Sequence, residues 1–197
     1  MKVFVILSLL FSFSSHAQVL GELQGDGQIQ ASYARFDGSK DNRTSPCHVA
    51  MNIDKSADSF ALEFSFFECA KLAAWNDAPY SYKIVNGQLI DANGAAKGTV
   101  NNDGSLQFSE KTMSFHKYFE ETYDFNCRLI SSSPRTLVLN TVISYTFKQS
   151  ADGSWQVRRQ ASEDRLAYTS RRSYPSCPAQ TIPTKLGSTS DLSVVIK

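Results

Sequence analysis

Polar and apolar side chains alternate along most of this chain, and that alternation restricts its fold more than any other feature. In segment 23–33 the even positions are all polar, and four of the odd positions carry Leu23, Ile29, Ala31 and Tyr33. Side chains of a β-strand point alternately to its two faces, so this pattern predicts a strand with one buried face. The same period recurs to the end of the chain, so the sequence predicts an all-β protein.

Glycine and proline divide the alternating pattern into short strands. The dipeptides Asn86-Gly87, Asn93-Gly94 and Asp103-Gly104 suit the positive φ angles of tight hairpin turns. Polar loops are predicted at 37–46 and 131–136 and a turn at 163–164; the only stretch with helical character is 70–75. The predicted strands are 23–33, 47–54, 59–69, 81–85, 88–91, 97–101, 105–110, 118–129, 136–149, 154–160 and 165–174, followed by an extended segment at 192–196.

So many hairpin-connected strands predict an antiparallel meander that closes into an up-and-down β-barrel, because closure removes exposed strand edges. A two-sheet β-sandwich is the alternative. The length fits a single domain over residues 18–197. Its Pro-rich C-terminal tail, from about residue 173 to 197, either pairs with the sheet or trails from it.

Residues 1–17 have the organisation of a cleavable secretory signal peptide. Lys2 precedes the apolar stretch Val3–Phe13, and Ser15-His16-Ala17 offers small residues at the cleavage site. The stretch is about half of the roughly 20 residues that a membrane-spanning helix needs. We therefore expect cleavage before Gln18, a secreted or periplasmic protein, and no membrane-spanning segment in the mature chain.

All four cysteines lie in the mature part of the chain: Cys47, Cys69, Cys127 and Cys177. An even number of cysteines in an exported chain predicts two disulfides, with three possible connectivities. Spacing favours Cys47–Cys69, which would flank one hairpin, together with Cys127–Cys177. No two cysteines have the spacing of a zinc site, so no metal is predicted.

Charge and motifs argue against several classes of function. The formal net charge is +1, and the signal contributes Lys2, so the mature chain has no basic surplus for nucleic acid. No G-x-S-x-G motif is present. The carboxylates of Glu120-Glu121 and Glu163-Asp164 are neighbours in sequence, so in a strand each pair would point to opposite faces. The sequence therefore predicts a protein that is not an enzyme and that has no cofactor.

Six residues are candidates for ligand binding. Phe64, Trp75, Tyr145 and Trp155 are aromatic residues that could line the interior of the barrel, with the segment 70–75 as a partial lid. An ordinary filled core is the alternative. Arg158 and Arg171 are predicted on one face of a hairpin, where they could hold a carboxylate or phosphate group, or form a solvated outer face.

The export signal, the meander of this length and the two bridges are similar in outline to lipocalin-like barrels. Those proteins usually carry Gly-x-Trp near the first strand, whereas the segment Gly21–Tyr33 has no tryptophan. The resemblance therefore extends to architecture alone and implies no site residues. Small periplasmic enzyme inhibitors share this general size and style.

The sequence thus predicts an exported binding protein that holds a small apolar or amphipathic ligand inside a barrel. One alternative is an inhibitor or adaptor that binds another extracytoplasmic protein through the loops at 37–46 and 131–136. A further alternative is a small outer-membrane barrel, since strands of alternating polarity are typical of that class too.

Overall fold

The structure is a computed structural model that describes residues 18–19, 22–70 and 77–197. The proposed signal peptide, most of the predicted helical segment and Trp75 lie outside these residues. All regular elements in the described part are strands. They are β1 (Gln18–Val19), β2 (Leu23–Ala34), β3 (Lys40–Lys55), β4 (Ser59–Cys69), β5 (Tyr80–Val85), β6 (Gln88–Ile90), β7 (Ala96–Val100), β8 (Leu106–Tyr123), β9 (Leu129–Gln149), β10 (Trp155–Arg171) and β11 (Gln180–Ile196).

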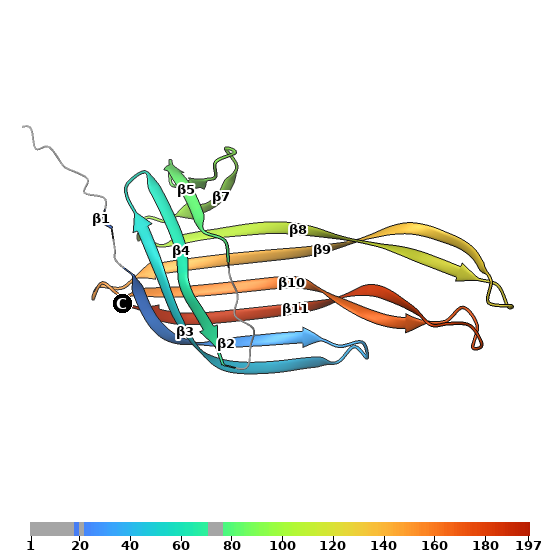
Figure 1. Cartoon of the computed structure of the whole chain (residues 1–197). Coiled ribbons are helices and arrows are strands. Elements are labelled where there is room, and N and C mark those ends of the chain that lie inside the picture. The colour runs from blue at the N-terminus through green and yellow to red at the C-terminus, as the bar shows by residue number, and fades with distance from the viewer. Residues whose placement is uncertain (1–17, 20–21, 71–76) are drawn as a thin grey trace, which may run out of the picture.

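The strands form one antiparallel sheet, ten strands of which close into a ring (Figure 1). From β2 to β11 each strand pairs with the next one along the chain, and β11 pairs back onto β2. β1 adds to β3 outside this ring. The predicted all-β antiparallel meander is therefore confirmed, and ring closure leaves its ten strands paired on both sides.

The end of the chain completes the ring. Of the two alternatives for the Pro-rich C-terminal segment, pairing is the one that the structure has, since β11 lies between β10 and β2. Its last residue also pairs with β2: the backbone amides of Gln24 and Lys197 each donate to the other residue's carbonyl, at 3.1 and 3.0 Å.

Several predicted strand boundaries are wrong, because segments predicted to lie between strands are themselves strand, as in β8, which joins the predicted strands 105–110 and 118–129. β3 begins at Lys40, inside the predicted loop 37–46. β9 begins at Leu129 and includes the predicted loop at 131–134, and the turn lies earlier, at 124–128. β10 runs without a break through Glu163 and Asp164, where a turn was expected. Where both faces of a sheet meet water, strands need no apolar alternation, so composition alone does not mark them.

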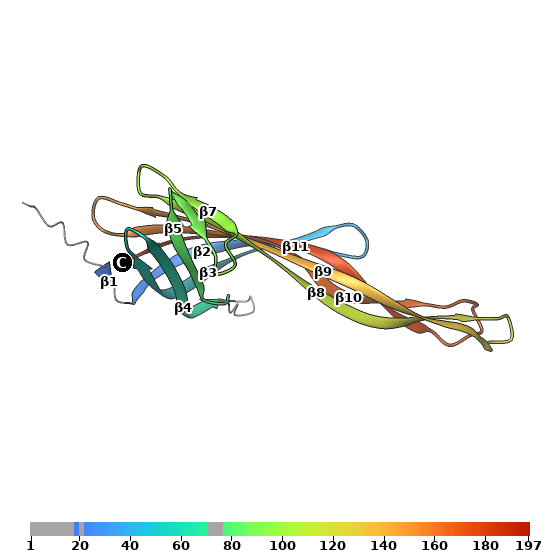
Figure 2. The same ribbon diagram turned by 90° about the horizontal axis from the view of Figure 1, so that it is seen from above.

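Four strands extend far beyond the ring and form an arm (Figure 2). Pairing of β9 with β10 ends at Thr141–Glu163, and pairing of β11 with β2 ends at Ser188–Tyr33. Beyond these points β8 and β9 continue as one hairpin and β10 and β11 as another. We use "arm" for the two hairpins over residues 111–141 and 164–187.

The main hydrophobic core lies inside the ring, and none of its members comes from the arm. Aromatic rings dominate it. The ring centroid of Phe60 is 5.5 Å from that of Phe147 and 5.9 Å from that of Phe108, and the centroids of Phe108 and Tyr145 are 5.1 Å apart. The closed ring of strands is therefore stabilised by burial of large side chains, whereas the arm is stabilised by backbone pairing and by a disulfide.

Both predicted disulfides are present. Cys47 and Cys69 are directly opposite each other in the β3–β4 ladder, so this bridge crosses one hairpin of the ring. Cys127 lies in the turn between β8 and β9, and Cys177 lies in the loop between β10 and β11. The second bridge therefore joins the tips of the two hairpins of the arm. Over the described residues, no helix is long and apolar enough to cross a membrane.

Candidate functional site

The aromatic candidates lie in the ring interior. Phe64 is partly buried and its ring centroid is 5.8 Å from that of Tyr145, which is 1% exposed. Trp155 is buried in the same core cluster, with the ammonium of Lys55 5.8 Å from its ring centroid. The structure thus brings Phe64 and Tyr145 together, whereas Trp75 falls outside the described residues.

A buried ion pair that was not predicted from the sequence lies beside these aromatic rings. Arg159 donates from Nε to Oδ2 of Asp77 at 2.7 Å and from Nη2 to Oδ1 at 2.9 Å. The hydroxyl of Tyr145 also donates to Oδ2 of Asp77. The two charged side chains are only 2% and 9% exposed, so the pair is held in the low-dielectric interior.

The pKa values of this cluster follow from burial and charge. Burial raises the pKa of the Tyr145 hydroxyl, and the negative charge of Asp77 raises it further. Burial opposes the charge of Arg159, but hydrogen bonds with Asp77 and the nearby Tyr145 outweigh it and raise the pKa of the guanidinium. A phenol that stays protonated and a guanidinium that stays charged suit a structural role better than proton transfer.

The space beside this ion pair is small. A gap lined by Phe64, Phe67, Asp77 and Arg159 leaves no room for a water molecule. The alternation along β10 could have indicated a buried arginine, because Arg159 lies between Val157 and Ala161, two buried residues on the same face of the strand. An arginine on an inward face requires a buried anion, which here comes from a distant part of the chain.

Arg158 and Arg171 do not form the predicted pair. They belong to one strand, β10, at positions of opposite parity and roughly 40 Å apart along it. Arg158 makes a bidentate contact with Asp191, at 2.9 and 2.5 Å. Arg171 lies in the arm and lines a cavity of about 290 Å³ at the tip. Glu120 lines the same cavity, 3.8 Å from Arg171, and offsets its charge.

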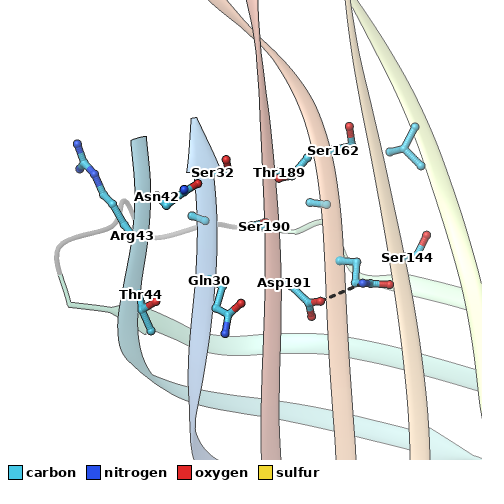
Figure 3. Close-up of a pocket in the computed structure, with 14 residues that line it drawn as sticks. Gln30, Ser32, Asn42, Arg43, Thr44, Ser144, Ser162, Thr189, Ser190 and Asp191 are labelled. Carbon is cyan, nitrogen blue, oxygen red and sulfur yellow. Dashed lines mark hydrogen bonds between the residues drawn. The ribbon is translucent and has the colours of Figure 1, made fainter. Parts of the chain in front are cut away.

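A groove lies on the outer face of the ring (Figure 3). It has a volume of about 580 Å³ and crosses five neighbouring strands: β3, β2, β11, β10 and β9. Most of the side chains around it are short and polar, which leaves the hollow open above the sheet. Its polar lining consists of Gln30, Ser32, Asn42, Arg43, Thr44, Ser144, Gln160, Ser162, Thr189, Ser190 and Asp191.

Many polar side chains of the groove have no hydrogen-bond partner in the described part of the chain. Within the described part of the chain, no side-chain hydrogen bond is formed by Gln30, Ser32, Asn42, Thr44, Ser162 or Thr189. Hydroxyl groups both donate and accept hydrogen bonds, and a primary amide carries a donor and an acceptor side by side. The groove therefore presents a row of unpaired donors and acceptors to one molecule.

The groove is close to electrically neutral. Asp191 is its one carboxylate, and Arg158 neutralises it; the hydrogen bond from Arg158 holds the pKa of Asp191 below its ordinary value of 3.8. Gln160 donates to the same carboxylate at 3.0 Å. Arg43 at the rim is paired with Asp41 at 2.7 Å. A ligand that matches this lining is polar and uncharged.

Sequence reasoning could not have found this groove. Its members come from five strands that are adjacent in the sheet but span residues 30–191 of the chain, and each one alone is an ordinary exposed polar residue. The contacts that unite them depend on the closing of β11 onto β2. The alternation places each side chain on the outer face without indicating its neighbours.

The described residues show no group of three or more His, Cys, Asp or Glu side chains that could hold a metal ion. His48 is exposed, with Nδ1 2.8 Å from Oδ1 of Asp26. His116 packs edge-on against Tyr168, with 6.3 Å between ring centroids. Each histidine therefore has a local contact that accounts for its position.

Comparison with protein-family models and with curated proteins finds no match for this chain.

Proposed function

We propose that this protein is a non-enzymatic binding protein of an extracytoplasmic compartment, and that the groove on the outer face of the ring is its ligand site. In this proposal the ring is an up-and-down β-barrel, similar in outline to lipocalins, that serves as a rigid scaffold. The observation that carries the proposal is the row of six unpaired hydroxyl and amide side chains along one groove of about 580 Å³.

The ligand class follows from this chemistry. A carbohydrate chain is uncharged, extended and rich in hydroxyl groups, each of which donates and accepts hydrogen bonds. Ser, Thr, Asn and Gln side chains supply the complementary donors and acceptors. Because the groove crosses the strands, a linear oligosaccharide could lie across β2, β11 and β10 and contact Gln30, Thr189 and Ser162 in turn.

The compartment is part of the proposal. Two disulfides are typical of proteins that fold in oxidising surroundings. The sequence of residues 1–17 resembles a secretory signal peptide, which supports export of the chain from the cytoplasm.

A small apolar or amphipathic ligand inside the ring stays a prediction. The tight gap beside Phe64 and Arg159 favours a filled core in the described part of the interior. Most of the predicted lid, residues 71–76, lies outside the described part of the chain. An interior ligand would occupy a different place from the groove, which is on the outer face of the ring.

The groove can be tested by titration calorimetry with a panel of short, linear, neutral oligosaccharides. For any oligosaccharide that binds, Gln30→Ala and Thr189→Ala should each weaken binding about tenfold, since each removes one or two hydrogen bonds to the ligand. Competition by a charged oligosaccharide of equal length should be weaker, because the groove offers it no unpaired opposite charge.

Matched controls lie on the same strands. Gln28 on β2 and Ser193 on β11 are exposed on the same outer face, are directly paired in the sheet and lie outside the groove. Gln28→Ala and Ser193→Ala should leave affinity unchanged. Binding of no oligosaccharide, or equal losses in both pairs of variants, would refute the groove as a carbohydrate site.

A further inference from the structure

One face of the β8–β9 hairpin in the arm combines apolar and basic side chains. Directly opposite residues of antiparallel strands lie on the same face of a sheet, so the register defines this surface. On β8 it consists of Lys111, Met113, Phe115, Lys117 and Phe119, and on β9 of their partners Val142, Asn140, Val138, Thr136 and Pro134. We name these residues the apolar–basic face.

The large side chains of this face are exposed to an unusual degree. Met113 is 58%, Phe115 64% and Phe119 63% exposed. The exposure continues to the tip, where Phe125 in the turn is 72% and Ile130 at the start of β9 is 64% exposed. Isolated exposed apolar residues are ordinary, but a contiguous group of this kind marks an interaction surface.

The opposite face of the same hairpin has a different environment. There His116 contacts Tyr168 of the β10–β11 hairpin, and Glu120 lies 3.8 Å from Arg171 of the same hairpin. Gln180 donates to the backbone carbonyl of Phe119 at 3.2 Å, and the disulfide joins the two tips. The second hairpin thus supports the arm from behind and leaves the apolar–basic face toward solvent.

The charges of this face have one sign. It contains two lysines and no carboxylate. Neither Lys111 nor Lys117 forms an ion pair with any residue that the structure describes. Toward the tip, the next pair on the same side of the hairpin is Glu121 and Ser132, so one carboxylate lies between the two lysines and the turn; it accepts a hydrogen bond from the hydroxyl of Tyr123 at 2.6 Å. A partner that binds here would therefore be apolar and carry negative charge.

We propose that the apolar–basic face, together with Phe125 and Ile130 at the tip, binds the surface of an anionic phospholipid bilayer. Phenylalanine and methionine side chains enter the boundary between head groups and acyl chains, and lysines reach the phosphates with their long flexible stems. The charge complementarity favours lipid over a protein partner, because an apolar surface with unpaired lysines matches a uniformly anionic, apolar-cored surface.

This inference does not depend on what the groove binds, but it adds a geometric consequence. Val142 belongs both to the apolar–basic face and to the lining of the groove. A docked arm would therefore hold the groove next to the bilayer surface.

The test is co-sedimentation of the purified, disulfide-bonded protein with two kinds of vesicle. One contains phosphatidylcholine mixed with phosphatidylglycerol, and the other contains phosphatidylcholine alone. We expect strong binding to the anionic vesicles, weakened by added salt, and little binding to the neutral ones. The variant Phe115→Ser/Phe119→Ser should reduce binding at least about tenfold, since it removes two aromatic anchors. Lys111→Gln/Lys117→Gln should reduce it several-fold and flatten the salt dependence.

The control variants remove a phenylalanine or two lysines from exposed positions outside the arm. Phe36 is 58% exposed in the turn between β2 and β3, outside the arm, so Phe36→Ser should have no effect. Lys40→Gln/Lys83→Gln removes the same charge from other exposed positions and should also have no effect. Phe115→Trp adds a measurement that needs no loss of binding: its additional emission should shift to the blue on anionic vesicles.

Three results would overturn the proposal. The first is no binding of the unmodified protein to anionic vesicles. The second is equal loss of binding in the control variants, which would point to a general charge or solubility effect. The third is self-association in sedimentation velocity that Phe115→Ser/Phe119→Ser abolishes, which would show that a second copy of the chain covers this face.

Discussion

Cys127 is disulfide-bonded to Cys177 from a backbone position that glycine occupies in the comparable turns of this protein. The φ angle of Cys127 is 60°, in the left-handed region. Four other hairpin turns repeat the hydrogen-bond pattern of its turn, and each has glycine at the equivalent place: Gly38, Gly94, Gly104 and Gly153. Cysteine is less favourable than glycine in this conformation, so the turn is less stable locally, but the cysteine links the two tips of the arm.

The double variant Cys127→Ser/Cys177→Ser should loosen the arm and leave the ring intact. The bridge closes a loop of 50 residues, for which chain entropy gives about 4 kcal/mol as an upper estimate. Because the hydrophobic core is confined to the ring, the loss should appear as local opening of the arm. Hydrogen exchange should accelerate in 111–141 and 164–187 and stay slow in β3 and β4; uniform acceleration would contradict this. Cys47→Ser/Cys69→Ser, within the ring, is the comparison.

Replacing Gly25 should strain the closure of the ring. A Cβ atom at this position would lie 2.0 Å from the backbone oxygen of Val195 on β11. Since backbone cannot move aside as a side chain can, Gly25→Ala should lower the free energy of unfolding by about 1–3 kcal/mol or more. At Gly187 a Cβ would meet nothing within 4 Å. Gly187→Ala is therefore the control, expected to be near neutral, and denaturant unfolding of both variants decides the matter.

Breaking the buried ion pair should be more harmful than removing it. Asp77→Ala leaves the Arg159 guanidinium in the interior without its carboxylate, which should cost about 3–5 kcal/mol. The double variant Asp77→Ala/Arg159→Met should be more stable than Asp77→Ala alone. Urea unfolding of Asp77→Ala, Arg159→Met and the double variant gives the coupling energy of the two side chains. If the two single losses simply add up to the loss in the double variant, the side chains do not stabilise each other. The exposed pair Arg158–Asp191 is the comparison, and breaking it should have a much smaller effect.

Arg158→Gln should raise the pKa of Asp191 toward its ordinary value of 3.8. In the folded protein this pKa is lowered, so the interaction stabilises the fold above the unfolded value and is lost as the pH falls through the folded value. Both side chains are partly exposed, so solvent screens the interaction and its effect on stability should be small and present at neutral pH. A carboxyl NMR titration of Asp191 measures the shift, and no change would exclude Arg158 as its cause.

Local patterns predicted the features that depend on neighbours in sequence. Asn86 and Gly87 both have positive φ in a two-residue turn, as the dipeptide predicts. Cys47 and Cys69 meet because β3 and β4 form one hairpin. The start of β9 at Leu129 and the continuity of β10 through Asp164 were missed, because in the arm polar side chains are compatible with strands whose faces are solvated.

What the sequence by itself determined is the all-β character, the hairpin order and the two disulfides, because alternation and turn residues act over short distances along the chain and four cysteines allow only three pairings. Only the tertiary structure decided that β11 closes onto β2, that Asp77 neutralises Arg159, and that hydroxyl groups from five strands line one groove. It also decided that four strands leave the ring as an arm with an exposed apolar–basic face. These features depend on register between distant strands, and register is set by packing of the whole sheet.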